Sequence, residues 1–226
     1  MEFPRIIMRL LPILLFNGCI YPALSCFYQS RLEALLIPDC SNELVVMQKT
    51  VDYIPLAILP AETLRGSLES ECASTCRKNQ YQNGSTILCN SALFSSQSAP
   101  ICELYTATSR FEANPVPDLL FSRSTVYYEK LCMSQASTAS NCANHVTSFQ
   151  QKIFVGFNEA VITADSYESC VGSCLSANFN CQSGYYYHEQ TSNNCHLNFR
   201  DHQGNNGLLV DERTNQRVIY FSTSSC

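Results

Sequence analysis

Residues 67–76 read SLESECASTC, and residues 165–174 read DSYESCVGSC. Each stretch predicts a short helix, with Ser67 and Asp165 as N-caps and Glu168 at the capping-box position after Asp165. Two cysteines that stand four residues apart on a helix share one face. This arrangement favours two bonds into a neighbouring element over one bond within the helix.

Both stretches belong to a duplicated pattern. Residues 40–132 contain six cysteines, and residues 142–226 contain six more. The sequence around them also matches in order: CNSALF (89–94) with CQSGYY (181–186), CEL (102–104) with CHL (195–197), and VYY (126–128) with VIYF (218–221). We therefore predict a tandem repeat joined by the polar linker 133–141. Because each cysteine set is complete, each module is expected to fold independently.

The strings that follow the helices have strand character. Residues 91–94 and 183–187 are apolar or aromatic runs, and residues 126–128 and 218–221 read as closing strands. The expected fold class is therefore α+β. It consists of two tandem disulfide-rich modules, each a short helix packed on a small antiparallel sheet.

The N-terminus has the features of a secretory signal peptide over residues 1–25. Arginines precede a short apolar stretch, and residues 23–25 place small side chains at the −3 and −1 positions of a cleavage site. An uncleaved signal anchor is the alternative, but the stretch is short for a bilayer and no later segment approaches about 20 apolar residues. We predict a secreted, extracellular chain with no membrane span after cleavage, in which residues 26–39 form an N-terminal extension.

Composition narrows the function. Fourteen cysteines in 226 residues indicate an oxidising compartment and disulfides. Structural zinc is the alternative, with His188 and His196 near the second cysteine set. Structural zinc sites more often use paired knuckles, however, and the secretory start together with the even number of cysteines in each repeat favours disulfides. The net charge of −5 argues against nucleic acid as a partner. No catalytic motif is present, so we predict no enzyme activity and no metal or other cofactor.

The helical Cys-x-x-x-Cys, the two strand strings, the Cys-x-Leu string and the ending VYYEKLC (126–132) together resemble the PAN/apple domain. The ending is similar to tandem PAN modules of invertebrate cuticle and apical-matrix proteins. In that group a zona-pellucida-type polymerisation domain often follows. This sequence departs from that pattern because it stops at Cys226, so self-polymerisation by that route is not expected.

Six cysteines allow 15 connectivities, and spacing alone does not choose among them. The family resemblance implies a nested order in each module. The implied pairs are Cys40–Cys132, Cys72–Cys102, Cys76–Cys89, Cys142–Cys226, Cys170–Cys195 and Cys174–Cys181. Signal cleavage would leave Cys26 as the remaining cysteine, near the new N-terminus, where an exposed thiol could form an intermolecular bond, for example in a disulfide-linked dimer. Two alternatives stay open: capping of the thiol by a small thiol, and a cleavage that also removes Cys26.

Three further features are candidate sites. Tyr185, Tyr186, Tyr187 and His188 could form a ligand patch, although strand alternation places at least one tyrosine in the core. Asn83 begins an Asn-Gly-Ser glycosylation sequon, which can also serve simply as a turn. The basic pair at residues 77–78 suits a solvated helix end near the C-terminal dipole, since a heparin-type site needs a larger cluster.

These features predict an extracellular protein- or carbohydrate-binding module whose partners are extracellular proteins or glycans. The resemblance implies a structural component of cuticle or apical extracellular matrix. Two alternatives remain open. One is an adhesin-like or lectin-like glycan binder, and the other is a regulatory fragment of a larger protease-type or polymerising precursor.

Overall fold

A computed structural model of the chain describes residues 40, 44–56, 58–97, 99–109, 118–133, 142 and 145–226. The predicted signal peptide, the N-terminal extension and Cys26 lie outside the described residues. The predicted linker also lies outside them except for Met133, which is buried and ends a strand.

The first module consists of one helix on a five-stranded sheet. Its elements are β1 (Leu44–Pro55), β2 (Glu62–Arg65), α2 (Glu69–Lys78), β3 (Ser91–Ser95), β4 (Ile101–Tyr105) and β5 (Leu119–Met133). The strands lie in the order β2-β4-β3-β5-β1 and pair antiparallel within the module. Helix α2 covers one face, where Cys72 and Cys76 pack against Ala92, Leu104 and Tyr128.

The second module repeats this arrangement and adds a small two-stranded sheet. Its elements are β6 (His145–Gln150), β7 (Lys152–Phe154), β8 (Asn158–Ile162), α3 (Tyr167–Leu175), β9 (Ser183–Tyr187), β10 (Cys195–Asn198), the 3₁₀ turn η2 (Asn206–Leu208), β11 (Leu209–Asp211) and β12 (Val218–Ser222). The main strands lie in the order β6-β12-β9-β10-β8, while β7 pairs with β11. The expected α+β fold of two disulfide-rich modules is confirmed.

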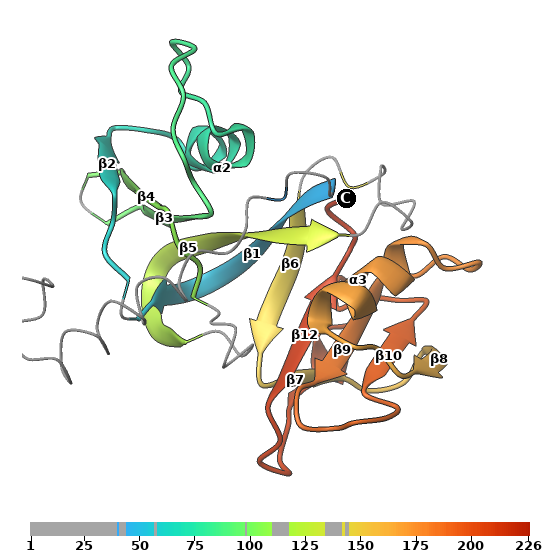
Figure 1. Cartoon of the computed structure of the whole chain (residues 1–226). Helices are drawn as coiled ribbons and strands as arrows, with labels where there is room; N and C mark the ends of the chain where they lie inside the picture. The colour runs from blue at the N-terminus through green and yellow to red at the C-terminus, as the bar shows by residue number, and fades with distance from the viewer. Residues whose placement is uncertain are drawn as a thin grey trace, which may run out of the picture.

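The two modules join into one ten-stranded sheet. β1 pairs in parallel with β6, with Met47 opposite His145 and Thr50 opposite Ser148, and Figure 1 shows these strands side by side near the middle of the molecule. All other pairings in the sheet are antiparallel, and the strand order runs in mirror sequence from this junction to β2 on one side and β8 on the other. A parallel central pair with the same strand order on either side indicates that a local two-fold axis relates the two modules. This axis runs between β1 and β6, parallel to both strands.

This symmetry places the two helices on opposite faces of the sheet. Met47 belongs to the core under α2, whereas its neighbour Val46 is fully buried in the core under α3. Successive residues of a strand point to opposite faces of the sheet, so Val46 and Met47 lie on different faces. The helix that covers each of them therefore lies on a different face as well. The core under α3 also contains Leu131 and Met133. Module 2 therefore shares its core with module 1, which differs from the expectation of two independent units.

Polar side chains fill the junction beyond this shared core. Thr50 Oγ1 and Ser148 Oγ lie 2.8 Å apart, and Gln48 Nε2 donates to Ser148 Oγ at 2.9 Å. All three residues are buried. A buried hydroxyl or amide is costly unless it is hydrogen-bonded, so these bonds favour a single register between β1 and β6.

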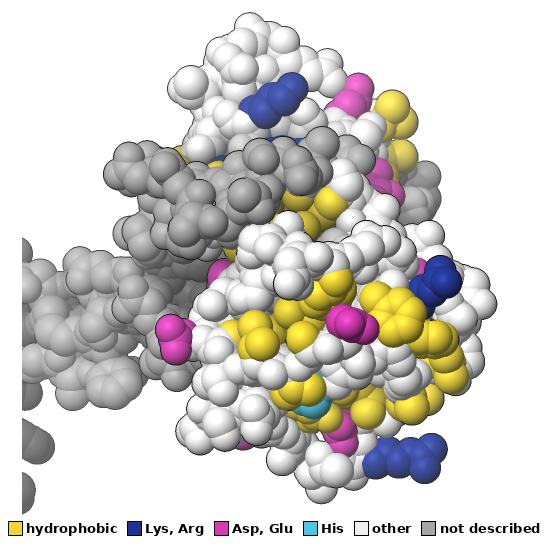
Figure 2. Space-filling view, turned by 90° about the vertical axis from the view of Figure 1, so that its right-hand side faces the viewer, with side chains coloured by type: hydrophobic (Ala, Val, Ile, Leu, Met, Phe, Trp, Pro, Cys, Tyr) yellow, Lys and Arg dark blue, Asp and Glu magenta, His cyan; other side chains and the backbone are white. Residues whose placement is uncertain are grey.

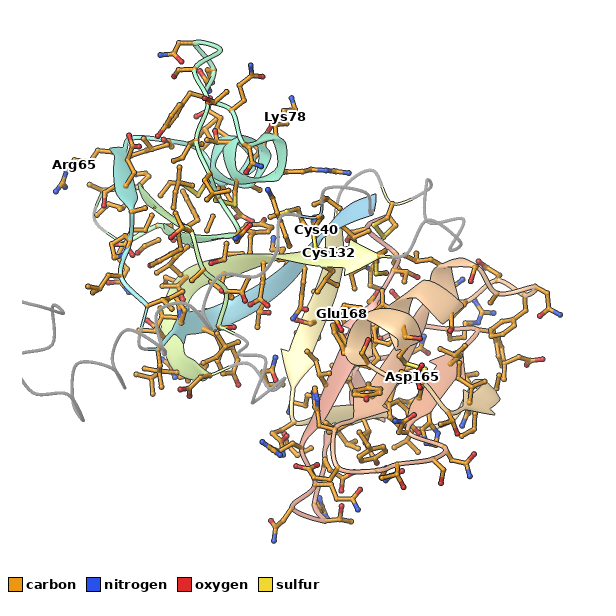
Figure 3. All side chains as sticks on the ribbon, in the orientation of Figure 1. Cys40, Arg65, Lys78, Cys132, Asp165 and Glu168 are labelled. Carbon is orange, nitrogen blue, oxygen red and sulfur yellow. A yellow bond between two sulfur atoms is a disulfide. The ribbon has the colours of Figure 1, made fainter. Side chains whose placement is uncertain are left out.

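Both predicted helix N-caps are wrong by one residue. α2 begins after Leu68, whose backbone N–H donates to Glu71 Oε2 at 3.0 Å. α3 begins after Ser166, whose hydroxyl accepts from the Ser169 backbone N–H at 3.1 Å. The Ser166 hydroxyl satisfies a free N–H of the first turn, so Asp165, the expected cap and the expected capping-box partner of Glu168, lies one residue before the observed cap. Figure 3 shows these two acidic side chains at the start of α3.

Six disulfides close the two modules. The bonds are Cys40–Cys132, Cys72–Cys102, Cys76–Cys89, Cys142–Cys226, Cys170–Cys195 and Cys174–Cys181. These pairs have the nested order that the family resemblance implies. Within each module two bonds join a helix cysteine to a residue in or next to a strand, and the third bond joins the first and last cysteines of the module. Figure 3 shows Cys40 and Cys132 together beside the end of β5.

Gly184 offers a test of the packing between β9 and its neighbours. A Cβ at this position would lie 2.6 Å from the His196 carbonyl oxygen and 2.5 Å from the Phe221 ring. We expect Gly184→Ala to lower the free energy of unfolding by about 1–3 kcal/mol, because the buried site has no room for a methyl group. Chemical denaturation measures the change. Gly207→Ala is the control, because apart from the local backbone and the adjacent residues no heavy atom lies within 4 Å of the new Cβ. Equal stability of the two variants would contradict the packing described here.

Candidate functional site

The structure divides the tyrosine run of β9 between the two faces of the sheet. Tyr186 is buried under α3, where its ring meets that of Tyr167 at 6.3 Å. His188 lies on the same side, with its ring 5.1 Å from that of Tyr186. Tyr185 and Tyr187 point to the opposite face and remain partly exposed. The four residues therefore do not form one surface patch, and of this run Tyr185 and Tyr187 are the two that are partly exposed on the face away from α3.

Tyr185 and Tyr187 form a cluster with residues from three other segments. The His196 ring stacks on Tyr185 with centroids 4.5 Å apart, and the Tyr187 ring meets both at 5.8–5.9 Å. Asn158 Nδ2 lies 3.1 Å from His196 Nδ1, and the Tyr187 hydroxyl donates to Glu212 Oε2 at 2.7 Å. We call these five residues the aromatic cluster. It combines ring surfaces with hydrogen-bonding groups at its margins.

The aromatic cluster continues into an apolar rim at the edge of the sheet. Val161 of β8 lies opposite His196 in the strand register, and its side chain is 43% exposed. Phe157 and Phe199 are also exposed, with ring centroids 5.4 Å apart. Figure 2 shows hydrophobic side chains gathered on this side of module 2. Exposed apolar surface next to polar groups is typical of a contact site.

Local environment sets the charges in the aromatic cluster. Burial raises the pKa of Tyr185 and of Tyr187, so both hydroxyls stay protonated. Burial lowers the pKa of His196, which favours the neutral imidazole. The hydrogen bond from Tyr187 lowers the pKa of the Glu212 carboxyl. At neutral pH the cluster therefore offers hydroxyl donors, a neutral ring and one carboxylate.

A hollow lies where the two modules meet, and we call it the junction pocket. It has a volume of about 760 Å³. Its walls come from β1, α2, β5 and the first residue of β6. The lining residues are Met47, Lys49, Leu68, Glu69, Ser70, Ala73, Ser74, Arg77, Lys78, Tyr128 and His145.

Asn83 lies at the tip of an exposed turn after α2. Its side-chain oxygen accepts hydrogen bonds from the Ser85 backbone N–H at 3.0 Å and from the Ser85 hydroxyl at 2.7 Å. Gly84 between them has a φ of +85°, a conformation that glycine adopts readily. The Asn83 side chain is exposed, so the predicted glycosylation sequon lies at the protein surface.

Two further observations concern the described residues only. They contain no group of three or more His, Cys, Asp or Glu side chains arranged to hold a metal ion. No helix among them has both the length and the apolar character needed to cross a membrane.

Sequence reasoning missed most members of both sites. His196 could have been found, because pairing β9 with β10 as a hairpin places it opposite Tyr185. Glu212 lies 25 residues after Tyr187, in a segment without a distinguishing pattern. Lys49 and His145 belong to different modules, and only the pairing of β1 with β6 brings them to one pocket.

The PAN domain family model matches residues 48–132 and 142–226. An uncharacterized protein of Caenorhabditis elegans is 33% identical over 161 residues, which cover 67% of this chain and 23% of the relative. The chain thus spans about a quarter of that relative's length. PAN domains are protein- or carbohydrate-binding modules. The chain therefore belongs to the PAN domain family and carries two PAN domains in tandem.

Proposed function

We propose that the protein is a secreted binding protein that attaches to protein or carbohydrate partners as a structural component of cuticle or apical extracellular matrix. The observation that carries this proposal is the aromatic cluster on the face of module 2 away from α3. Its ring surfaces are partly exposed, and their polar margins lie next to exposed apolar side chains. The resemblance to matrix PAN pairs supports the matrix assignment.

The aromatic cluster suits a ligand with both apolar and hydroxylated surface. Tyrosine rings provide apolar area while keeping one polar atom available, which makes them frequent contact residues. The Asn158 amide and the Glu212 carboxylate add a donor and an acceptor beside the rings. A saccharide ring, or a polar protein loop, meets this combination of ring surface and hydrogen-bonding groups.

Tyr187→Ala tests the role of the aromatic cluster. We expect at least a tenfold loss of affinity, because truncation removes ring contact and the hydroxyl that holds Glu212. Binding of the secreted chain to a glycan array, and to solubilised invertebrate cuticle on a biosensor, measures the effect. Tyr53→Ala is the matched control, since Tyr53 is a partly exposed tyrosine with one ring contact in module 1.

Two results would overturn the proposal. One is full binding by Tyr187→Ala, with affinity equal to that of the wild type and of the Tyr53→Ala control. The other is a folded wild-type chain that binds neither the glycan array nor the cuticle material.

A further inference from the structure

We propose that the tandem also has a mechanical function, in which tension along the chain passes through the two outer disulfides and leaves both modules folded. The outer disulfides are Cys40–Cys132 and Cys142–Cys226. This function goes beyond ligand binding because it concerns how an extracellular chain transmits force. It depends on the covalent connections of the chain and does not require the aromatic cluster.

The shortest covalent path from Cys40 to Cys226 contains very little of either module. It crosses from Cys40 to Cys132, follows the backbone to Cys142, and crosses from there to Cys226. The Cα atoms that the two bonds connect are 5.4 and 4.0 Å apart, although 92 and 84 residues separate them along the chain. The backbone between the two bonds reaches about 36 Å when fully extended. Helices α2 and α3 and nearly all strand residues therefore lie outside the path that carries tension.

Both outer bonds lie at the same end of the junction between the modules. β1 begins shortly after Cys40, β6 begins shortly after Cys142, and the two strands pair in parallel, so their first residues lie at the same end. Arg77 Nη2 of module 1 donates to the Cys142 carbonyl at 3.2 Å, and Cys226 Sγ lies 3.6 Å from the His145 carbonyl oxygen. A pull that separates the two outer bonds therefore acts on one end of the β1–β6 pair.

The junction is the noncovalent contact that this pull loads. A load at one end of a strand pair acts on the nearest hydrogen bonds in turn, whereas a load along the strands would be shared by all of them. Val46 packs under α3 close to the loaded end, and the contact between Thr50 and Ser148 lies further along the same strands. We expect the junction to open from its cysteine end. The backbone between Cys132 and Cys142 then limits the separation, and both modules stay folded.

Burial makes the outer disulfides more accessible than the inner ones. Cys40, Cys132 and Cys226 are partly exposed. Both cysteines of the longer inner bond of each module are fully buried, namely Cys72, Cys102, Cys170 and Cys195. Thiol–disulfide exchange requires access to a sulfur atom, so a reducing agent cleaves the outer bonds first. Each cleavage brings one module into the path under tension.

The length that each cleavage adds follows from the bonds that remain. Without the outer bond of module 2, the path runs through 84 residues less the 25 that Cys170–Cys195 keeps closed, which is 59 residues or about 200 Å of extended chain. Without the outer bond of module 1, it runs through 92 residues less the 30 that Cys72–Cys102 keeps closed, which is 62 residues or about 210 Å. Both lengths are several times the reach of the backbone between the outer bonds.

Optical-tweezers measurements on the full secreted chain, with a DNA handle joined to each end, test the proposal. The force is set at a value that unfolds molecules reduced beforehand. Without reductant, we expect the wild type to lengthen by no more than about 36 Å once the segment before Cys40 is taut. Dithiothreitol added to the same molecules should then produce two steps of about 200 Å each. The wild type is folded before reduction starts, so this result does not depend on the folding of a variant.

Three variants make the result specific. Cys142→Ala, Cys226→Ala should lengthen by about 200 Å without reductant, whereas Cys174→Ala, Cys181→Ala removes a bond outside the path and should not. Tyr187→Ala should behave as the wild type throughout, so failure of this proposal and failure of the aromatic cluster can be told apart. The inference is overturned if the oxidised wild type lengthens by about 200 Å, or if reduction under force adds no step of that size.

Discussion

Replacing Cys142 and Cys226 together with alanine is expected to lower the free energy of unfolding by about 4.6 kcal/mol. This bond spans 84 residues, and the chain-entropy picture assigns about that stabilisation to a loop of this length. Removing the Cys174–Cys181 bond in the same way should cost about 2.4 kcal/mol, since it closes only seven residues. The larger loop leaves the unfolded chain more freedom once the bond is gone.

Guanidinium denaturation of the two double variants measures this difference. Cys174 is buried in the core under α3, and Cys181 is partly buried against that core. Replacing this pair therefore also removes some packing. Loop entropy should nevertheless dominate, and the 142/226 variant should have the lower midpoint. Equal losses, or a greater loss for the seven-residue loop, would show that the outer bond is not what holds module 2 closed.

Replacing Thr50 and Ser148 together with cysteine is expected to create a seventh disulfide that joins the two modules. Their side-chain oxygens lie 2.8 Å apart on paired strands, so sulfur atoms at these positions can reach each other. The new bond should add about 3–4 kcal/mol of loop-closure stabilisation, because Cys40–Cys132 already shortens the chain path between the two positions. The substitutions also remove the two hydroxyl acceptors of the buried Gln48 amide, which costs about 1–3 kcal/mol, so the net gain in the free energy of unfolding is expected to be smaller than the gain from the bond alone. Thermal or chemical unfolding of the oxidised variant measures the gain.

Much of each module could be predicted from sequence because its signals are local. The Cys-x-x-x-Cys helices and the strand strings depend on spacing within about ten residues, and the structure has an element at each of them. The two PAN domains were recognisable for the same reason, because their matching strings recur in order. Even the errors at the helix N-caps are small, since Ser166 and Leu68 are next to the residues expected to act as caps.

The junction could not be predicted because no local signal marks it. β1 and β6 lie in different repeats, and parallel pairing across them leaves no turn to identify. Gln48, Thr50 and Ser148 are polar and alternate along their strands, a pattern that normally indicates a solvent-exposed face. They are instead buried against one another.

Both candidate sites combine residues that the sequence marks with residues that only the fold brings near them. Tyr185 and Tyr187 stand out in the sequence, and strand alternation places them on the face opposite to Tyr186 and His188. The sequence does not tell which of the two faces α3 covers, and so which pair of side chains is exposed. The basic residues of the junction pocket are scattered, and Lys49 meets Arg77 and Lys78 only in the folded module.

Non-reducing peptide mapping of the Thr50→Cys, Ser148→Cys variant tests the shared sheet most directly. The account predicts a peptide pair linked through residues 50 and 148, with all six native bonds intact. The variant Lys49→Cys, Ser148→Cys is the matched control, because residue 49 faces the α2 side while residue 148 faces the α3 side, and it should yield no such pair. A secreted variant with the six native bonds but free thiols at positions 50 and 148 would contradict the continuous sheet.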